Sequence, residues 1–388
     1  MPLALEGIKV IEMGIFGPGT ITSQWLGDLG AQVIMVEAPT GPQSAAWREG
    51  GAARAENARN KHSIVLNLKS ADAQAVLHKL VKASDVFIEA NRPGVSKRLG
   101  FDYPTLSAIN PRLIYCSVTG YGQEGPYKMM PGHGNAWEGT GGWHRLQGQG
   151  LGNMGGEYTG KPWLNPFNLA DIKGALNAMV AITTALYVRD RIGAGQYIDQ
   201  ALVDGVIAVG RKGAPASGVS AIERDPRPSW NVYECKDGKY IATAAGEEFQ
   251  WGNLCKGLGV PELAKEVSPQ GNRANEITKT FERIFKTRTR DEWFVHLNKL
   301  DTEATRCNTM DEAAEDPQVK LRGMHVEVLG EDGHREIQYG TPFKLLKTPA
   351  RKTHRRAPKF GEHTDQILAE AGYTKADLDR LRRAGAVS

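Results

Sequence analysis

Cysteine is scarce in this sequence, and long apolar runs are absent. No two cysteines form a C-x-x-C pair, so neither a zinc site nor a disulfide framework is indicated; the four are Cys116, Cys235, Cys255 and Cys307. No stretch of about 18 or more apolar residues occurs, which speaks against a membrane span. The first residues lack the basic region and the apolar run of a secretory signal. We therefore expect a cytoplasmic protein with no metal site and no membrane partner.

A dense basic run is also missing. The 48 basic and 44 acidic residues are mixed along the chain and give a formal charge of +4, so we expect no nucleic-acid partner. Hydrophobic residues make up 40% and charged residues 24%, as in an ordinary globular protein. Single cores stop growing near about 250–300 residues, so a chain of 388 residues predicts two domains.

Three common catalytic signatures are absent. The sequence contains no G-x-x-x-x-G-K-[ST], no H-E-x-x-H and no G-x-S-x-G. This excludes the usual motifs for nucleoside triphosphates, zinc hydrolysis and the serine nucleophile elbow. Carboxylates and histidines remain as candidates for chemistry.

The N-terminal segment has the pattern of a strand, a glycine turn, a helix and a second strand. The apolar runs lie at residues 8–11 and 33–37, and the glycine turn lies at residues 14–19. Similar runs recur at residues 63–68, 86–89 and 113–118. Alternation of this kind predicts a mostly parallel sheet covered by helices.

A long alanine-rich helix is predicted over residues 171–191, ending at Gly193. Residues 205–228 are rich in Gly, Ala, Ser and Pro, which suits a connection between domains. A hairpin about Asp237-Gly238 is then predicted at residues 231–242. Further helical patterns follow around residues 249–258, 277–285 and 291–297, with a polar helix at the C-terminus.

Two residues are candidates on local grounds. Asp171 is placed just before the long helix, where a carboxylate accepts backbone N–H bonds and stays ionised; a plain helix cap is the alternative to a nucleophile. His133 lies in a flexible turn before a glycine-rich tract, as either a surface histidine or an acid–base catalyst. The glycine turn at 14–19 either admits a phosphate or is only a tight turn, and its spacing is not the dinucleotide fingerprint.

Three stretches carry a family resemblance. Residues 84–103 read SDVFIEANRPGVSKRLGFDY, and residues 109–127 read INPRLIYCSVTGYGQEGPY. The third combines Asp171-Ile-Lys-Gly-Ala with the G-x-G-Q-x-x-D pattern within residues 191–199. Together they closely resemble the class III CoA-transferase family, which includes formyl-CoA and carnitine CoA-transferases and the α-methylacyl-CoA racemases. Weaker similarity covers nearly the whole chain, except residues 143–166 and the tail.

The resemblance implies an α/β fold with a large Rossmann-like domain that contains a parallel sheet. Its CoA-binding part would span residues 1–210, and residues 331–388 would return to it. A smaller inserted α+β domain would span residues 225–330. The resemblance also implies a dimer of interlocked rings, either a homodimer or a heteromer with a paralogous subunit.

The resemblance further implies an enzyme that moves CoA between an acyl-CoA thioester and a carboxylic acid. Asp171 would form first an aspartyl anhydride and then an aspartyl-CoA thioester. No cofactor would be bound permanently, because the CoA thioester is a co-substrate. Cations and amides suit the phosphates and adenine of CoA, with a plain surface charge as the alternative for each cation. The positions carried over as CoA contacts are Gln24, Arg59, Lys61, Arg92, Tyr121 and Gly122.

Some positions depart from the transferase pattern. Pro18-Gly19-Thr20 replaces the usual Ala-Gly-Pro, and Met35 or Ala38 replaces a common cation. Residues 242–251 more nearly resemble the racemase branch, in which His133 and Asp171 would be an acid–base pair helped by Glu247. The motif around His133 keeps the histidine but lacks the aspartate that normally follows it. We rank the transferase above the racemase, because the altered motif and the unmatched residues 143–166 indicate a pocket reshaped for another acceptor. A structural subunit of a heteromeric transferase ranks last, because Asp171 is retained.

Overall fold

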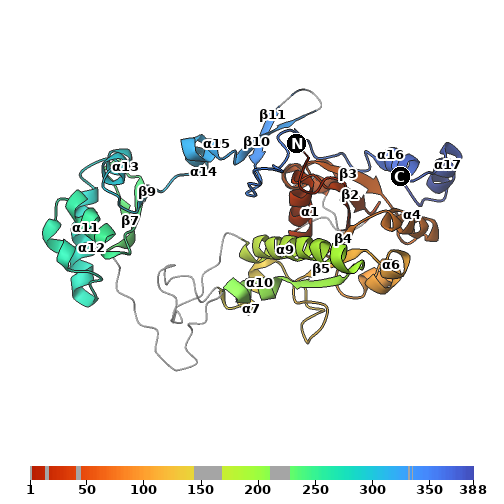
Figure 1. Cartoon of the computed structure of the whole chain (residues 1–388), viewed down its shortest axis with the longest axis horizontal. Coiled ribbons are helices and arrows are strands. Elements are labelled where there is room, and N and C mark those ends of the chain that lie inside the picture. The colour runs from red at the N-terminus through yellow and green to blue at the C-terminus, as the bar shows by residue number, and fades with distance from the viewer. Residues whose placement is uncertain are drawn as a thin grey trace. The chain divides into compact units, whose positions relative to one another are not determined.

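The structure is a computed structural model that describes residues 2–13, 17–40, 45–143, 168–209, 228–330, 333 and 335–388. These residues form two compact units. Unit 1 takes its described residues from Met1–Gln147, Pro162–Arg211 and Gly323–Ser388, and unit 2 takes its own mainly from Lys212–Arg322. Both units are shown in Figure 1.

A six-stranded parallel sheet forms the centre of unit 1. Its strands lie in the order β3-β2-β1-β4-β5-β6. They span β1 (Lys9–Met13), β2 (Gln32–Glu37), β3 (Lys61–Val65), β4 (Val86–Glu89), β5 (Ile114–Thr119) and β6 (Tyr197–Ala201). The predicted parallel sheet is therefore confirmed, and β6 is an addition to it. The order of the strands is that of a Rossmann-like domain, and its direction reverses between β1 and β4.

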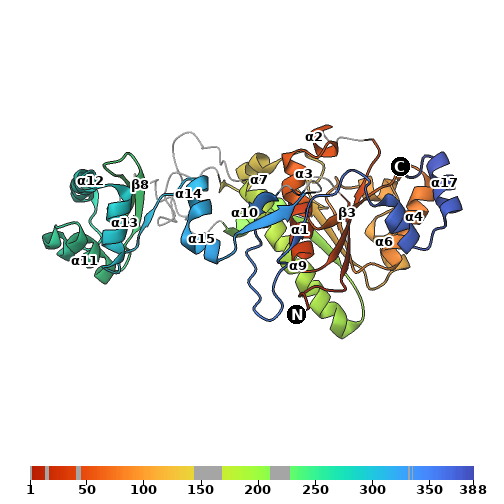
Figure 2. The same cartoon turned by 90° about the horizontal axis from the view of Figure 1, so that it is seen from above.

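Helices cover both faces of this sheet because successive side chains of each strand point to opposite faces. Val10 packs with α1 (Pro18–Asp28), α9 (Leu169–Ile192) and α10 (Leu202–Val209) on one face. Its neighbour Ile11 packs on the other face. The helices there are α4 (Ala71–Lys82), α6 (Tyr103–Ile109), α16 (Thr364–Glu370) and α17 (Lys375–Arg383), as Figure 2 shows.

The C-terminal segment of unit 1 contacts the N-terminal strands. Val387 forms a β-bridge with Leu66, and Thr364 at the start of α16 accepts a hydrogen bond from the backbone N–H of Val65. A separate small sheet consists of β10 (His325–Leu329), β11 (Arg335–Tyr339) and β12 (His354–Arg355). Short helices complete the unit: α2 (Ala45–Arg48), α3 (Ala52–Asn57), α5 (Val95–Arg98) and α7 (Gly134–Thr140).

The long helix α9 begins earlier than predicted. It starts at Leu169 because Asn168, in the left-handed conformation, occupies the cap position, and it ends at Gly193 as expected. Among the described helices, α9 alone has the length and apolar composition to cross a membrane, and 44% of its most apolar window is buried. Alanine and leucine side chains of α9 pack into the core beside the sheet. This apolar character therefore also suits a core helix, and it is weak evidence for a membrane span.

Unit 2 has an antiparallel sheet of β7 (Trp230–Glu234), β8 (Tyr240–Ala244) and β9 (Ala304–Arg306). The predicted hairpin is confirmed, with Gly238 at φ 73 in its turn. Three longer helices and one 3-10 turn pack around it: α11 (Glu248–Gly257), η1 (Pro261–Lys265), α12 (Gly271–Phe285) and α13 (Arg290–Asn298). The predicted connection at 205–228 is wrong at its start, because α10 continues to Val209; residues 210–227 lie outside the described residues.

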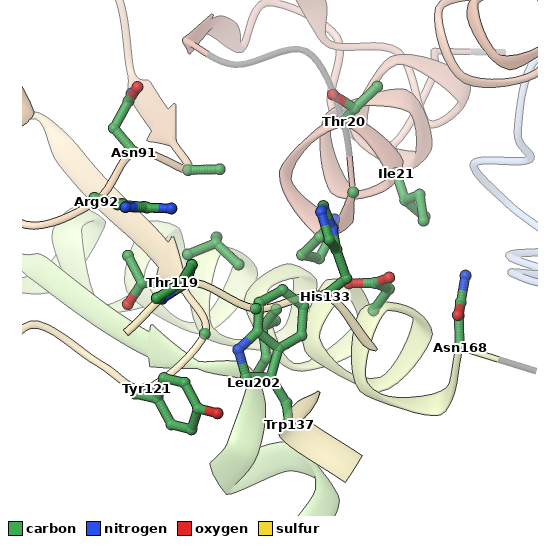
Figure 3. A pocket seen from close by; sticks show the side chains of 18 of the residues that line it. Thr20, Ile21, Asn91, Arg92, Thr119, Tyr121, His133, Trp137, Asn168 and Leu202 are labelled. Carbon is green, nitrogen blue, oxygen red and sulfur yellow. The ribbon is translucent and has the colours of Figure 1, made fainter. Parts of the chain in front are cut away.

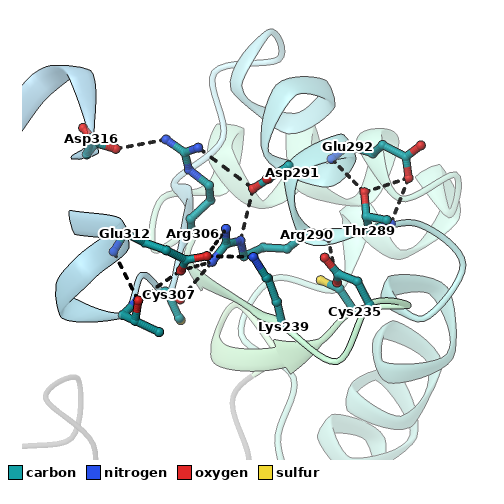
Figure 4. A network of polar contacts seen from close by, with 12 residues as sticks. Cys235, Lys239, Thr289, Arg290, Asp291, Glu292, Arg306, Cys307, Glu312 and Asp316 are labelled. Carbon is teal, nitrogen blue, oxygen red and sulfur yellow. Dashed lines mark hydrogen bonds and ion pairs between the residues drawn. The ribbon is translucent and has the colours of Figure 1, made fainter. Parts of the chain in front are cut away.

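A network of ion pairs joins several elements of unit 2 (Figure 4). Arg290 is buried and binds Glu312 of α14 (Met310–Glu315) through both terminal nitrogens, at 2.7 and 3.1 Å. Lys239 binds the same carboxylate at 2.7 Å, and Arg306 binds Asp316 before α15 (Pro317–Leu321) at 3.0 Å. These hydrogen bonds hold the pKa of Glu312 well below its usual range. The network fastens α14 to the hairpin and to α13.

Candidate active site

A cavity of about 1110 Å³ opens in unit 1 at the carboxyl ends of the central strands. Gly17 follows β1, Asn91 and Arg92 follow β4, and Gly120 follows β5 on its wall. In open parallel sheets, ligands bind at these ends where the strand order reverses. The cavity lies at that point, between the segments after β1 and β4. Figure 3 shows its lining side chains.

Asp171 lines the cavity from the first turn of α9. The prediction that it precedes the helix is wrong, because the helix begins two residues earlier at Leu169. The carboxylate is half-buried, and a Cβ placed on Gly17 would lie 3.9 Å from its Oδ1. Burial raises the pKa of Asp171 to about 6, and Glu138 adds to this shift while His133 opposes it. The position at a helix start predicted that Asp171 stays ionised, whereas the raised pKa makes the ionised form less favoured. At neutral pH most Asp171 carboxyl groups are still ionised.

His133 lines the same cavity, directly before α7. Figure 3 shows the His133 and Trp137 rings near the centre of the view and Arg92 at its left. His133 exerts a charge effect that lowers the pKa of Asp171. The structure thus brings together the histidine and the carboxylate that the sequence singled out.

Two cations that line the cavity, Arg92 and Lys128, have no partner among the residues that the structure describes. Arg92 and Lys128 are exposed, and no ion pair or side-chain hydrogen bond joins either of them to another described residue. Asp171 is the one acidic residue among the described lining residues. The electrostatics of the cavity therefore suit an anionic ligand.

The uncharged predicted CoA contacts occupy different places. Tyr121 lines the cavity, and its hydroxyl lies 3.3 Å from the hydroxyl of Thr140. Gly122 and Gln24 are buried and lie outside the lining. The Oε1 atom of Gln24 has no hydrogen-bond partner among the described residues. All three stay predictions, and Tyr121 alone of them reaches the cavity wall.

The other two predicted cationic contacts are buried in ion pairs. Arg59 Nη2 lies 2.6 Å from Oδ2 of Asp28, and Lys61 Nζ lies 2.8 Å from Oε2 of Glu12. Each cation is only 2% exposed, and neither lines the cavity. Their charges are thus already neutralised inside the protein. A CoA-binding role for Arg59 and Lys61 stays a prediction, and this arrangement does not favour it.

Glu247 belongs to unit 2, where it caps α11. A capping box joins it to Gln250, whose side chain accepts a hydrogen bond from the Glu247 N–H at 3.3 Å. This local role accounts for the residue. The predicted catalytic role of Glu247, as a residue that helps the His133–Asp171 pair, stays a prediction.

Sequence reasoning missed three residues beside the cavity: Trp137, Glu138 and Asn168. Trp137 and Asn168 line it, whereas Glu138 is buried behind it. The helix α7 that carries Trp137 and Glu138 was not predicted. The sequence indicated a flexible turn around His133 and then a glycine-rich tract, and glycine has low helix propensity. No group of three or more potential metal ligands occurs in the part of the chain that the structure describes.

Comparisons with known proteins identify the family of this chain. The family model of CoA-transferase family III matches residues 5–364. The chain belongs to this family. A succinate–glutarate CoA-transferase of Agrobacterium fabrum is 35% identical, over 94% of this chain and 95% of its own. An α-methylacyl-CoA racemase of Homo sapiens is 32% identical, over 98% and 96% respectively.

A solved crystal structure has a similar fold. The crystal structure of a CAIB/BAIF family protein from Brucella suis has a TM-score of 0.81 and 32% sequence identity. It covers 96% of this chain and 100% of its own. The family includes enzymes that act on CoA thioesters, so both transfer and racemisation have precedents among the relatives.

Proposed function

We propose that this protein is a CoA-transferase that moves CoA from an acyl-CoA thioester to a carboxylic acid, with Asp171 as the nucleophile. The observation that carries the proposal is that Asp171 lines a cavity together with two cations, Arg92 and Lys128, and is the one acidic residue among the described lining residues. A half-buried carboxylate in this position is reachable and only weakly solvated, which favours nucleophilic attack.

The first half of the reaction would transfer the acyl group and then CoA to Asp171. A carboxylate oxygen of Asp171 attacks the thioester carbonyl carbon, the carbon–sulfur bond breaks, and CoA leaves as a thiolate. The product is a mixed anhydride. The thiolate then attacks the aspartyl carbonyl carbon of the anhydride, releases the donor acid as a carboxylate, and leaves an aspartyl-CoA thioester.

The second half would reverse these steps with the acceptor. The acceptor carboxylate attacks the aspartyl thioester, the thiolate leaves, and a new anhydride forms. Attack of the thiolate on the acceptor's acyl carbon gives the new acyl-CoA and restores the Asp171 carboxylate. Every step exchanges one carboxylate or thiolate for another, so no net proton transfer is needed. Backbone N–H groups of the glycine-rich wall would stabilise the tetrahedral oxyanions.

Arg92, Lys128 and Tyr121 are the residues that we propose for binding CoA at the cavity. Arg92 and Lys128 lack partners in the described part of the chain, and phosphate is the anionic group that CoA presents several times. The relative from Agrobacterium fabrum is named for succinate and glutarate, so dicarboxylic acids are the first acceptors to test.

The decisive assay is incubation with succinyl-CoA or acetyl-CoA and a panel of carboxylic acids, followed by mass spectrometry of the CoA products. The proposal predicts that a new acyl-CoA appears only when both donor and acceptor are present. Hydrolysis of the donor at the same rate with or without acceptor would contradict it.

A racemase is the second candidate, because His133 and Asp171 line one cavity and a racemase is among the relatives. In that reaction the two residues would exchange the α-proton of the thioester from opposite faces. Under the transferase proposal, His133→Ala keeps substantial CoA transfer. Exchange of an α-proton in deuterated water without any acceptor acid would instead favour the racemase.

The domain boundaries, assembly and location inferred from the family resemblance are part of this proposal. We propose a large domain from residues 1–210 and 331–388, a small domain from residues 225–330, and a cytoplasmic, interlocked homodimer. Linked chains separate only after partial unfolding, so the dimer should persist on dilution. Light scattering that finds monomers at micromolar concentration would count against linkage. A second, related subunit in the native complex would instead indicate the heteromeric form.

A further inference from the structure

Glu138 is a buried carboxylate beside the candidate nucleophile, and the transfer steps above do not use it. Its side chain extends from α7, is 0% exposed, and does not line the cavity. Burying a carboxylate costs free energy unless hydrogen bonds or charges compensate. The contacts of Glu138 indicate a role that would explain why a carboxylate is buried here.

One oxygen of Glu138 caps the helix that carries Asp171. Oε1 accepts a hydrogen bond from the backbone N–H of Ala170 at 3.2 Å. Asn168, in the cap position of α9, has φ 33 and ψ 50 and makes no side-chain bond to the helix. Glu138 therefore supplies from another helix the acceptor that a capping residue normally supplies locally.

The packing of α7 on α9 reinforces this anchor. A Cβ placed on Gly134 would lie 3.1 Å from Oδ1 of Asn168, closer than side chains usually approach. Glycine at 134 thus permits the start of α7 to approach the start of α9. Because His133 directly precedes α7, the same contact holds His133 and Asp171 at one cavity.

The second oxygen of Glu138 acts through its charge. Oε2 is buried and has no hydrogen-bond partner among the described residues. A poorly solvated charge acts strongly on its neighbours, and Glu138 raises the pKa of Asp171 in addition to the larger effect of burial. His133 and Glu138 are the charged groups that act on Asp171. The contacting helices also carry Lys173 in α9, Asp204 in α10, and Asp28 at the opposite end of α1, where it is paired with Arg59.

We propose that Glu138 is a positioning residue for the reaction at Asp171: one oxygen holds the first turn of α9, and its charge acts on the Asp171 carboxylate. The role in catalysis rests on the proposed function, whereas the effect on the carboxylate does not. A carboxylate that is repelled by a neighbour ionises less readily and is a stronger nucleophile once ionised.

Two variants separate the two roles. Glu138→Gln keeps an acceptor for the Ala170 N–H and removes the charge. It should shift the titration of Asp171 to lower pH by at least about 0.5 unit, together with the acid limb of kcat/KM. Glu138→Ala removes the acceptor as well, and should lower kcat about tenfold with little change in KM for the acyl-CoA.

The titration is read directly by NMR of aspartate labelled at the carboxyl carbon, with the Asp171 signal assigned as the one that Asp171→Asn removes. Glu370→Gln, the same change on the exposed face of α16, is the matched control and should leave the signal unmoved. Thermal unfolding checks that each variant is folded.

A titration of Asp171 that is unchanged in Glu138→Gln would overturn the charge effect. A parental kcat in Glu138→Ala would overturn the positioning role. If the parent protein transfers no CoA at all, the proposed function fails, yet the NMR shift still decides whether Glu138 acts on Asp171.

Discussion

Unit 1 contains two groups of charged residues that differ in whether the protein itself neutralises them. The paired charges lie beneath the surface near β1 to β3, where Lys61 lies against Glu12 and Arg59 against Asp28. The cavity charges lie at the ends of the strands, where Arg92 and Lys128 have no partner in the described part of the chain and Asp171 is half-buried.

The comparison teaches that residue type alone does not distinguish a ligand contact from a structural ion pair. Arg59, Lys61 and Arg92 were all candidates for binding CoA, and each is a cation in a stretch that resembles the family. Only Arg92 faces the cavity. The paired charges should therefore matter for folding, and the cavity charges for binding and catalysis.

Breaking a buried pair should have the largest effect on stability. Lys61→Met leaves the Glu12 carboxylate buried without its cation, which should cost about 3–5 kcal/mol of unfolding free energy. Urea unfolding measures the loss. Combining it with Glu12→Gln should recover most of the stability, whereas Lys97→Met, at an exposed cation of α5, should change it little. If the Lys61→Met protein were fully stable but inactive, Lys61 would act in binding or catalysis and not as a structural ion pair.

The second prediction uses the raised pKa of Asp171, about 6 in the folded protein against an ordinary value near 3.9. Its ionisation is costlier in the folded chain, so this residue destabilises the protein as the pH rises toward and above 6. Asp171→Asn should therefore be more stable than the parent at pH 8 by about 1–3 kcal/mol, and nearly equal to it at pH 4. Unfolding at both pH values tests this. Asp204→Asn, at an exposed acid of α10, should show no such gain.

The sequence predicted strands well where apolar residues are continuous. It did not predict features that depend on contacts between residues far apart in the sequence. β4 was predicted to the residue, because its four residues are all buried. β6 was missed, because this sheet-edge strand has adjacent polar residues, Asp199 and Gln200, and is mostly exposed or partly exposed. The pairing of Arg59 and Lys61 could not be predicted either, since their acidic partners lie 31 and 49 residues away in the sequence.

The site shows the same division. Asp171 and His133 were candidates on local grounds and then matched the family motifs, whereas Glu138 has no local signal, because its hydrogen bond to the Ala170 N–H forms only when α7 packs on α9. Most of the tract 143–166, which the motifs did not cover, lies outside the described residues.

The smallest expected effect belongs to a cavity cation. Arg92→Ala should raise KM for the acyl-CoA about tenfold, because one charged contact to a phosphate is lost, with stability unchanged. Steady-state kinetics measure this. Arg98→Ala, at an exposed arginine of α5 that does not line the cavity, is the matched control. An unchanged KM in Arg92→Ala would remove Arg92 from the binding site.

The most direct test of the central claim is to trap the covalent intermediate on Asp171. The protein is incubated with an acyl-CoA donor and no acceptor, treated with hydroxylamine, and digested for mass spectrometry. An activated aspartyl carbonyl reacts with hydroxylamine where a free acid does not, so Asp171 alone should be modified. Asp171→Asn should show no label, keep its CoA affinity, and transfer CoA at least about 100-fold more slowly. Labelling of Glu247 or Glu248 instead, or transfer by Asp171→Asn above a hundredth of the parental rate, would contradict the account.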